Sequence, residues 1–165
     1  MGRQDQMEAL YEFFGGAVGT YVTSPSSVFP DIKTVSKGEP LRIDPLMMPA
    51  FYITAPKSKE TREYAQKKFI TYQLSAVLVW WTPGLTQKDA YDDRAQSALI
   101  AFYGTLEEVA ARIRTNKQLI TTSYPLGASI KFGETFTIDE QHERTETELL
   151  MVARFDIESV EQVNA

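Results

Sequence analysis

The sequence contains no cysteine and only one histidine among its 165 residues. Without cysteine, the chain can form no disulfide, no thiolate metal site and no thiol nucleophile. The histidine, His142, lies between Gln141 and Glu143 in a polar stretch, so a Ser-His-Asp arrangement would have to recruit it from an exposed position. The usual catalytic groups are scarce, and we therefore expect the chain not to be an enzyme.

Positive charge is also in deficit, because 22 acidic residues outnumber 17 basic ones and give a net charge of −5. Proteins that bind a nucleic-acid backbone need an excess of lysine and arginine to release counterions, so a nucleic-acid binder is disfavoured. Long apolar runs are missing as well. The longest, residues 76–81, is far too short to cross a bilayer, so no membrane contact is expected.

The remaining composition is that of one globular domain. Hydrophobic residues make up 43% of the chain and aromatic residues 12%. A chain of this length buries roughly 70% of the surface that it exposes when unfolded. Neither an internal repeat nor a shift in composition marks a second domain, so we expect residues 1–165 to form one domain.

Two short motifs resemble ligand sites, but each has a simpler structural explanation. The glycines within residues 15–19 follow an expected helix and lack the lysine and hydroxyl residue of a phosphate-binding loop. Asp89, Asp92 and Asp93 lie where a helix is expected to begin, and acidic side chains are favoured there by capping and by the helix dipole. No cofactor and no metal ion are expected.

Hydrophobic periodicity predicts two helical segments. Apolar side chains recur at helical spacing over residues 5–14, and Gly15-Gly16 would end that helix. A second apolar stripe runs through residues 89–116. Gly104 and the capping-box pattern that follows it leave two alternatives open, one helix or two helices that meet at a kink.

Four segments are predicted to be strands. Their ranges are 50–54, 69–81, 129–139 and 148–158. The last alternates apolar with polar residues, which predicts one buried face. The strand over residues 69–81 is apolar on both faces near its end, where Trp80 and Trp81 must point to opposite sides. Such a strand is either covered on both faces, or covered on one and docked onto a partner.

Three further segments are predicted to be irregular. Residues 19–49 contain five of the eight prolines, which excludes a continuous helix. An extended arm and a meander packed over the core are equally good explanations for them. Residues 57–68 are predicted to form a charged loop, with five cations and two anions, and residues 139–147 a polar loop.

The expected fold class is α/β (α+β). It consists of an antiparallel or mixed sheet of about four strands, helices packed on one face of that sheet, and a Pro-rich extended arm or loop.

Two segments are predicted to contact other subunits, the Pro-rich stretch over residues 19–49 and the charged loop over residues 57–68. For the charged loop, two explanations are open. A solvated surface is its default explanation, and a salt-sensitive contact with an acidic neighbour is the alternative. Trp81 joins it because tryptophan is enriched among interface anchors. The residues predicted for an assembly interface are Lys57, Lys59, Arg62, Lys67, Lys68 and Trp81.

The order of these elements resembles the tail terminator proteins of long-tailed bacteriophages, the family that includes the lambda-type terminator. The resemblance covers most of the chain. It rests on the helix over residues 7–14, the strand over 69–81, the helical segment that opens Asp92-Asp93-Arg94-Ala95, the strand over 132–138 and the closing strand over 148–157. The Pro-rich stretch is longer than the resemblance leads us to expect.

The resemblance implies a structural protein of the virion, found in the tail or neck after assembly in the host cytoplasm. Its subunits would form a hexameric ring that caps the tail tube, ends tube polymerisation and joins the tail to the head. The implied partners are other copies of the chain, the tail tube protein, a head-completion or connector protein, and DNA that passes through the lumen without specific binding. An acidic wall would repel the DNA backbone and suit that passage.

Two alternatives remain open. The first is another head–tail connector, neck or tail completion protein. The second is a small-molecule-binding or enzymatic α/β domain.

Overall fold

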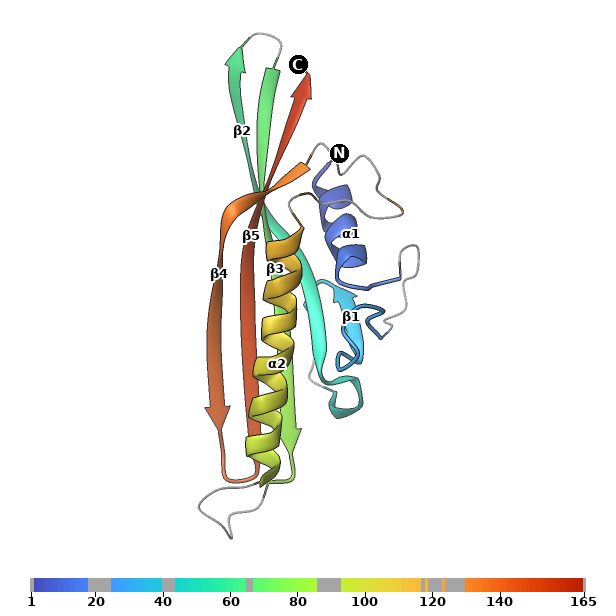
Figure 1. Cartoon of the computed structure of the whole chain (residues 1–165), viewed down its shortest axis with the longest axis vertical. Coiled ribbons are helices and arrows are strands. Elements are labelled where there is room, and N and C mark those ends of the chain that lie inside the picture. The colour runs from blue at the N-terminus through green and yellow to red at the C-terminus, as the bar shows by residue number, and fades with distance from the viewer. Residues whose placement is uncertain are drawn as a thin grey trace.

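The computed structural model describes residues 2–17, 25–39, 44–64, 67–85, 93–116, 118, 123 and 130–164. In these ranges one five-stranded sheet carries both α-helices on the same face (Figure 1). The strand order is β1-β2-β3-β5-β4, with β1 parallel to β2 and the other neighbours antiparallel. The expected α/β class, the mixed sheet and the helices on one face are confirmed.

The elements follow one another along the chain in a simple order. They are α1 (Arg3–Phe13), β1 (Thr34–Lys37), the short 3-10 helix η1 (Pro45–Met47), β2 (Ala50–Tyr64), β3 (Lys67–Pro83), α2 (Asp93–Thr115), β4 (Ile130–Arg144) and β5 (Glu148–Asn164).

The two predicted loops are wrong over most of their length, because residues 57–64, 67–68 and 139–144 belong to strands. Residues 145–147 do form the connection between β4 and β5, and residues 65–66 lie outside the described residues. Residues 57–64 continue β2 after a register shift between Thr54 and Lys57, and they pair with β3. Residues 139–144 complete β4 against β5. A neighbouring strand satisfies the backbone hydrogen bonds of a polar segment as well as those of an apolar one, so side-chain polarity alone does not end a strand.

Helix α2 is continuous, so the alternative of two helices meeting at Gly104 is wrong. Gly104 is exposed, and a side chain there would meet nothing within 4 Å. The opposite side of the helix buries Phe102, Leu106, Val109 and Ile113 against the sheet. This packing outweighs a glycine penalty of about 1 kcal/mol. Residues 89–92, where the helix was expected to begin, lie outside the described residues.

The described part of the Pro-rich stretch is a meander packed over the core, which is the second of the two alternatives. Phe29, Ile32 and Val35 are buried in the main core. Ser26 fixes the meander to the end of α1, since its hydroxyl donates to the Phe14 carbonyl at 2.8 Å. Residues 18–24 and 40–43 lie outside the described residues.

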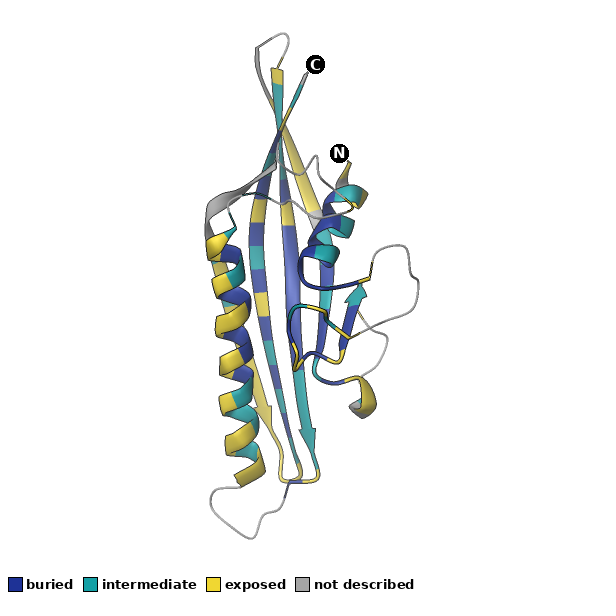
Figure 2. Cartoon of the chain, turned by 45° about the vertical axis from the view of Figure 1, so that its right-hand side comes forward, coloured by how far each residue is buried: buried dark blue, intermediate teal, exposed yellow. Residues whose placement is uncertain are grey.

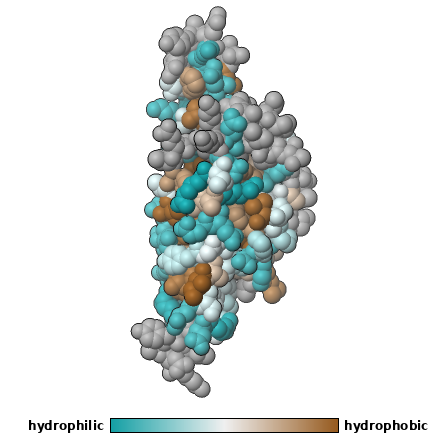
Figure 3. All heavy atoms as spheres, viewed as in Figure 1, coloured by the Kyte–Doolittle hydropathy of each residue, from teal (hydrophilic) through white to brown (hydrophobic). Residues whose placement is uncertain are grey.

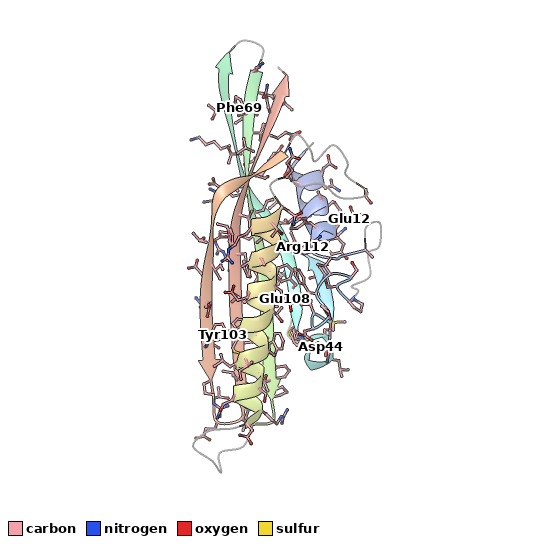
Figure 4. All side chains as sticks on the ribbon, in the orientation of Figure 1. Glu12, Asp44, Phe69, Tyr103, Glu108 and Arg112 are labelled. Carbon is pink, nitrogen blue, oxygen red and sulfur yellow. The ribbon has the colours of Figure 1, made fainter. Side chains whose placement is uncertain are left out.

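The main core fills the space between the helices and one face of the sheet. Alternate residues of β3, including Leu74, Ala76 and Leu78, point into it. The Phe14 and Phe51 rings meet edge to face at 4.9 Å and join α1 to β2. The guanidinium of Arg112 joins the helices, because its Nε donates to the Phe13 carbonyl at 2.7 Å (Figure 4). Among the described residues, no helix has the length and apolar character to cross a membrane.

Strands β2, β3 and β5 continue beyond the helices at one end of the molecule (Figure 1). We call residues 57–64 of β2 and 67–72 of β3 the ribbon. Residues 57–61 are exposed along both faces of β2, whereas the body of β3 is buried (Figure 2). The β2 strand of the ribbon therefore adds exposed surface, whereas Ile70 and Tyr72 of its β3 strand still pack on the main core.

Candidate docking surface

The face of the sheet opposite the helices, here called the open face, has an apolar cluster of its own. Val77 and Val79 of β3 alternate with the core residues of that strand and are only 5% and 7% exposed. Met48 and Ala50 pack with them, and the half-buried Tyr52, Trp81, Leu150 and Val152 surround them. In the described ranges, no α-helix covers this cluster, and only the short 3-10 helix η1 lies beside it.

The two tryptophans lie on opposite faces, as predicted. Trp80 packs against the main core and meets Phe102 edge to face at 6.3 Å. Trp81 belongs to the open face, where its Nε1 donates to Glu148 Oε2 at 3.0 Å. Of the two alternatives for this strand, the described residues fit the one in which helices cover only one face.

Two exposed apolar side chains lie beside the open face. Leu46 and Met47 of η1 are 85% and 45% exposed, next to the buried Met48. The short helix holds them in place, because Asp44 Oδ1 accepts from the Leu46 amide at 3.0 Å (Figure 4). An exposed apolar pair next to a partly buried apolar cluster is typical of an interface anchor.

The remainder of the open face is polar and surrounds a hollow of about 590 Å³. Ser75 Oγ donates to Asp156 Oδ1 at 2.7 Å, and Arg154 Nε donates to the same oxygen at 2.9 Å. Burial would raise the pKa of Asp156, but the hydrogen bonds from Arg154 and Ser75 hold it below its usual range. Burial raises the pKa of Tyr52, and the nearby Glu39 raises it further. The polar groups of Ser75, Arg154 and Asp156 are thus bonded to one another.

The cations predicted for an interface all lie on the ribbon. Lys57, Lys59 and Lys67 are exposed. Lys68 is partly buried and forms a 2.6 Å ion pair with Glu60 of β2. The backbone of Arg62 belongs to β2, and its side chain lies outside what the structure describes.

Trp81 does not join these cations. It lies 13 residues beyond Lys68 on the same strand, a separation of about 43 Å along β3. The predicted interface residues therefore divide between two surfaces, the charged ribbon and the apolar open face.

The sequence-based prediction missed the exposed pair of η1 and the outward apolar residues of β5. Leu150 and Val152 stand on the otherwise polar face of their strand, beside Trp81 and Val79. Two apolar residues in succession on a polar face were a usable signal. Leu46 and Met47 gave no such signal, because a short Pro-rich segment has no periodicity from which exposure can be read.

His142 lies on β4 rather than in a loop. Its Nε2 is 3.5 Å from Glu140, and its ring lies 5.7 Å from that of Phe102 and 6.2 Å from that of Tyr103. Figure 4 shows Tyr103 on the side of α2 next to β4. Across the described ranges, no group of three or more histidine, aspartate or glutamate side chains could hold a metal ion.

The helix side of the molecule has a mixed surface, with separate apolar spots among hydrophilic side chains (Figure 3). Ile100 is one exposed apolar residue of α2. No family model and no curated protein matches the sequence.

Proposed function

We propose that this chain is a structural subunit of a bacteriophage tail terminator. In this role, copies of the chain form a ring that caps the tail tube, ends its polymerisation and presents a surface to the head. The observation that carries the proposal is the open face. Its apolar cluster, next to the exposed Leu46 and Met47, is a docking surface on a domain that is already folded around a separate core.

The shape of the chain supports assembly. A ring subunit needs contacts with two neighbours as well as with the proteins above and below it, and so it needs several separate surfaces. The ribbon, the open face and the edge of β4 provide such surfaces (Figure 1).

The chemistry of the hollow supports a structural role over catalysis. A catalytic carboxylate is tuned so that its pKa lies near the working pH. The hydrogen bonds to Asp156 move its pKa the opposite way and favour the charged form. The hollow is best explained as a polar part of a docking face.

The proposal is tested by removing the chain from the phage that encodes it and examining the particles by electron microscopy. We expect tails of excessive and variable length, detached from heads, because nothing ends tube growth. The wild-type chain supplied in trans should restore tails of uniform length that are joined to heads. Uniform tails joined to heads in its absence would refute the proposal.

The same experiment separates the nearest alternative. A connector, neck or tail completion protein would leave tails of uniform length that fail to join heads. The hollow of about 590 Å³ is the one observation that favours a small-molecule-binding domain. Monomeric protein whose melting temperature rises with a particular metabolite would support that alternative.

A further inference from the structure

The sheet has two long edges, and they lie on strands of opposite charge. β4 is the last strand in the order β1-β2-β3-β5-β4. At the other side, β1 pairs with β2 only over Ala50–Ile53, and β2 then continues through the ribbon. An edge strand can add a strand from another chain through its backbone groups.

The exposed cations of the β2 edge point to the open face. Lys57 lies opposite Gln73 and Lys59 opposite Thr71, which are residues of β3 on the same side as Ser75 and Val77. Residues two apart on a strand share a face, and both lysines are exposed. The ribbon therefore presents two positive charges on one face, about 7 Å apart.

The β4 edge presents acidic residues on the same face of the sheet. Asp139 lies opposite Arg154, and Glu143 lies opposite Leu150. Both acidic side chains are exposed. They are four residues apart, or about 13 Å along the strand. The guanidinium of Arg154 is already bound by Asp156 at 2.9 Å.

We infer that the ribbon of one copy docks on the β4 edge of a second copy, with Lys57 and Lys59 facing Asp139 and Glu143. This contact would join the subunits of the proposed ring, and so the inference rests on the proposed function. Opposite charges on one face of paired strands stabilise the pairing, and long lysine side chains reach diagonal neighbours.

The strand directions allow this pairing. Each step from β2 to β3, β5 and β4 is antiparallel, so β2 and β4 run in opposite directions. When two copies have the same orientation, β2 of one is antiparallel to β4 of the next. The contact joins different surfaces of the two copies, and a contact of that kind produces a closed ring when its rotation closes.

A second copy fits better than an unrelated acidic partner, because one chain carries both complementary edges. Both charged sets lie on the same sheet face, as they would in one continuous sheet. A nucleic acid would match the lysines and be repelled by Asp139 and Glu143.

Charge reversal tests the contact. The ribbon variant carries Lys57→Glu and Lys59→Glu, and the edge variant carries Asp139→Lys and Glu143→Lys. Sedimentation velocity over a range of concentrations should show that each variant self-associates roughly 10- to 100-fold more weakly than the wild-type chain. An equimolar mixture of the two should associate again, since every ribbon then meets an edge of opposite charge. The chain with all four substitutions should associate by itself.

Matched controls separate this contact from general charge effects. Lys33→Glu and Glu108→Lys alter exposed residues outside both edges and should leave association unchanged. Circular dichroism should show the fold retained in every variant, because all four side chains at the contact are exposed.

Three results would overturn the inference. The wild-type chain could stay monomeric up to about 100 µM, or the charge-reversed variants could associate as strongly as the wild type. The third result is a mixture of the two folded variants that does not regain association. Failure here is distinguishable from failure of the proposed function. If the wild-type chain forms rings and the charge-reversed variants form them equally well, only this contact is refuted. Uniform, head-joined tails in phage lacking the chain would refute only the function.

Discussion

At the scale of single residues, two glycines occupy opposite environments. Gly15 ends α1 at a φ of 92°, and a Cβ atom there would lie 2.4 Å from Ser26 Oγ. Gly104 has helical neighbours and open space around it. We expect Gly15→Ala to lower the free energy of unfolding by about 2 kcal/mol or more, and Gly104→Ala to raise it by about 0.5–1 kcal/mol. Urea denaturation measures both, and equal effects would contradict the structure.

Asp156 should give the chain an acid-sensitive element of stability. Its folded-state pKa is depressed, so its stabilising effect is present above the unfolded-state value and is lost as the pH falls through the folded-state value. An unperturbed aspartate has a pKa of about 3.9, so this loss of stability falls below about pH 4. Asp156→Asn should lower the melting temperature at pH 7. In acid, the difference in melting temperature between this variant and the wild type should become smaller. A constant gap from pH 7 to pH 3 would show that the hydrogen bonds from Ser75 and Arg154 do not depend on the charge.

At the scale of elements, the sequence was most informative where one face is buried. The inward set of β5, from Leu149 to Ile157, follows strict alternation and is buried throughout. The ends of strands were not predictable, because residues 57–64 and 139–144 are polar. Their strand structure comes from pairing with the next strand in each of two long hairpins, β2–β3 and β4–β5. The docking surface was predictable in part. The position of Trp81 on the face opposite Trp80 was predicted from the sequence. The distance between Trp81 and the lysines became known only from the length of β3 in the structure.

The short helix η1 provides a test of the open face as a docking surface. Leu46→Ser with Met47→Ser should change the free energy of unfolding by no more than about 0.5 kcal/mol, because both side chains are exposed. Supplied to phage that lack the wild-type chain, this variant should yield at least about tenfold fewer complete particles.

Met48→Ala shows by comparison what a loss of folding stability does in that experiment. Met48 is buried, so its loss should destabilise the fold by about 2–5 kcal/mol. A Leu46/Met47 variant that is fully stable and still assembles normally would exclude this part of the surface from docking.

At the scale of the whole molecule, the open face carries different charges at the two edges of the sheet. Lys57 and Lys59 are exposed on the ribbon, while the β4 edge presents Asp139 and Glu143, and the chain as a whole carries a net charge of −5. This separation allows copies to attract one another although the chain is acidic. It also distinguishes the ribbon from a nucleic-acid site, because the lysines of an assembled ring would be covered by acidic edges.

DNA binding tests this distribution of charge. We expect the wild-type chain to show no binding to labelled duplex DNA at about 150 mM salt in fluorescence anisotropy, since the acidic body opposes the few cations of the ribbon. Any weak binding at low salt should depend on Lys57 and Lys59 and disappear in the variant that carries both Lys→Glu changes. Binding at moderate salt that falls steeply as salt rises would instead identify the ribbon as a phosphate-contacting surface. The lysines would then serve DNA rather than a neighbouring subunit.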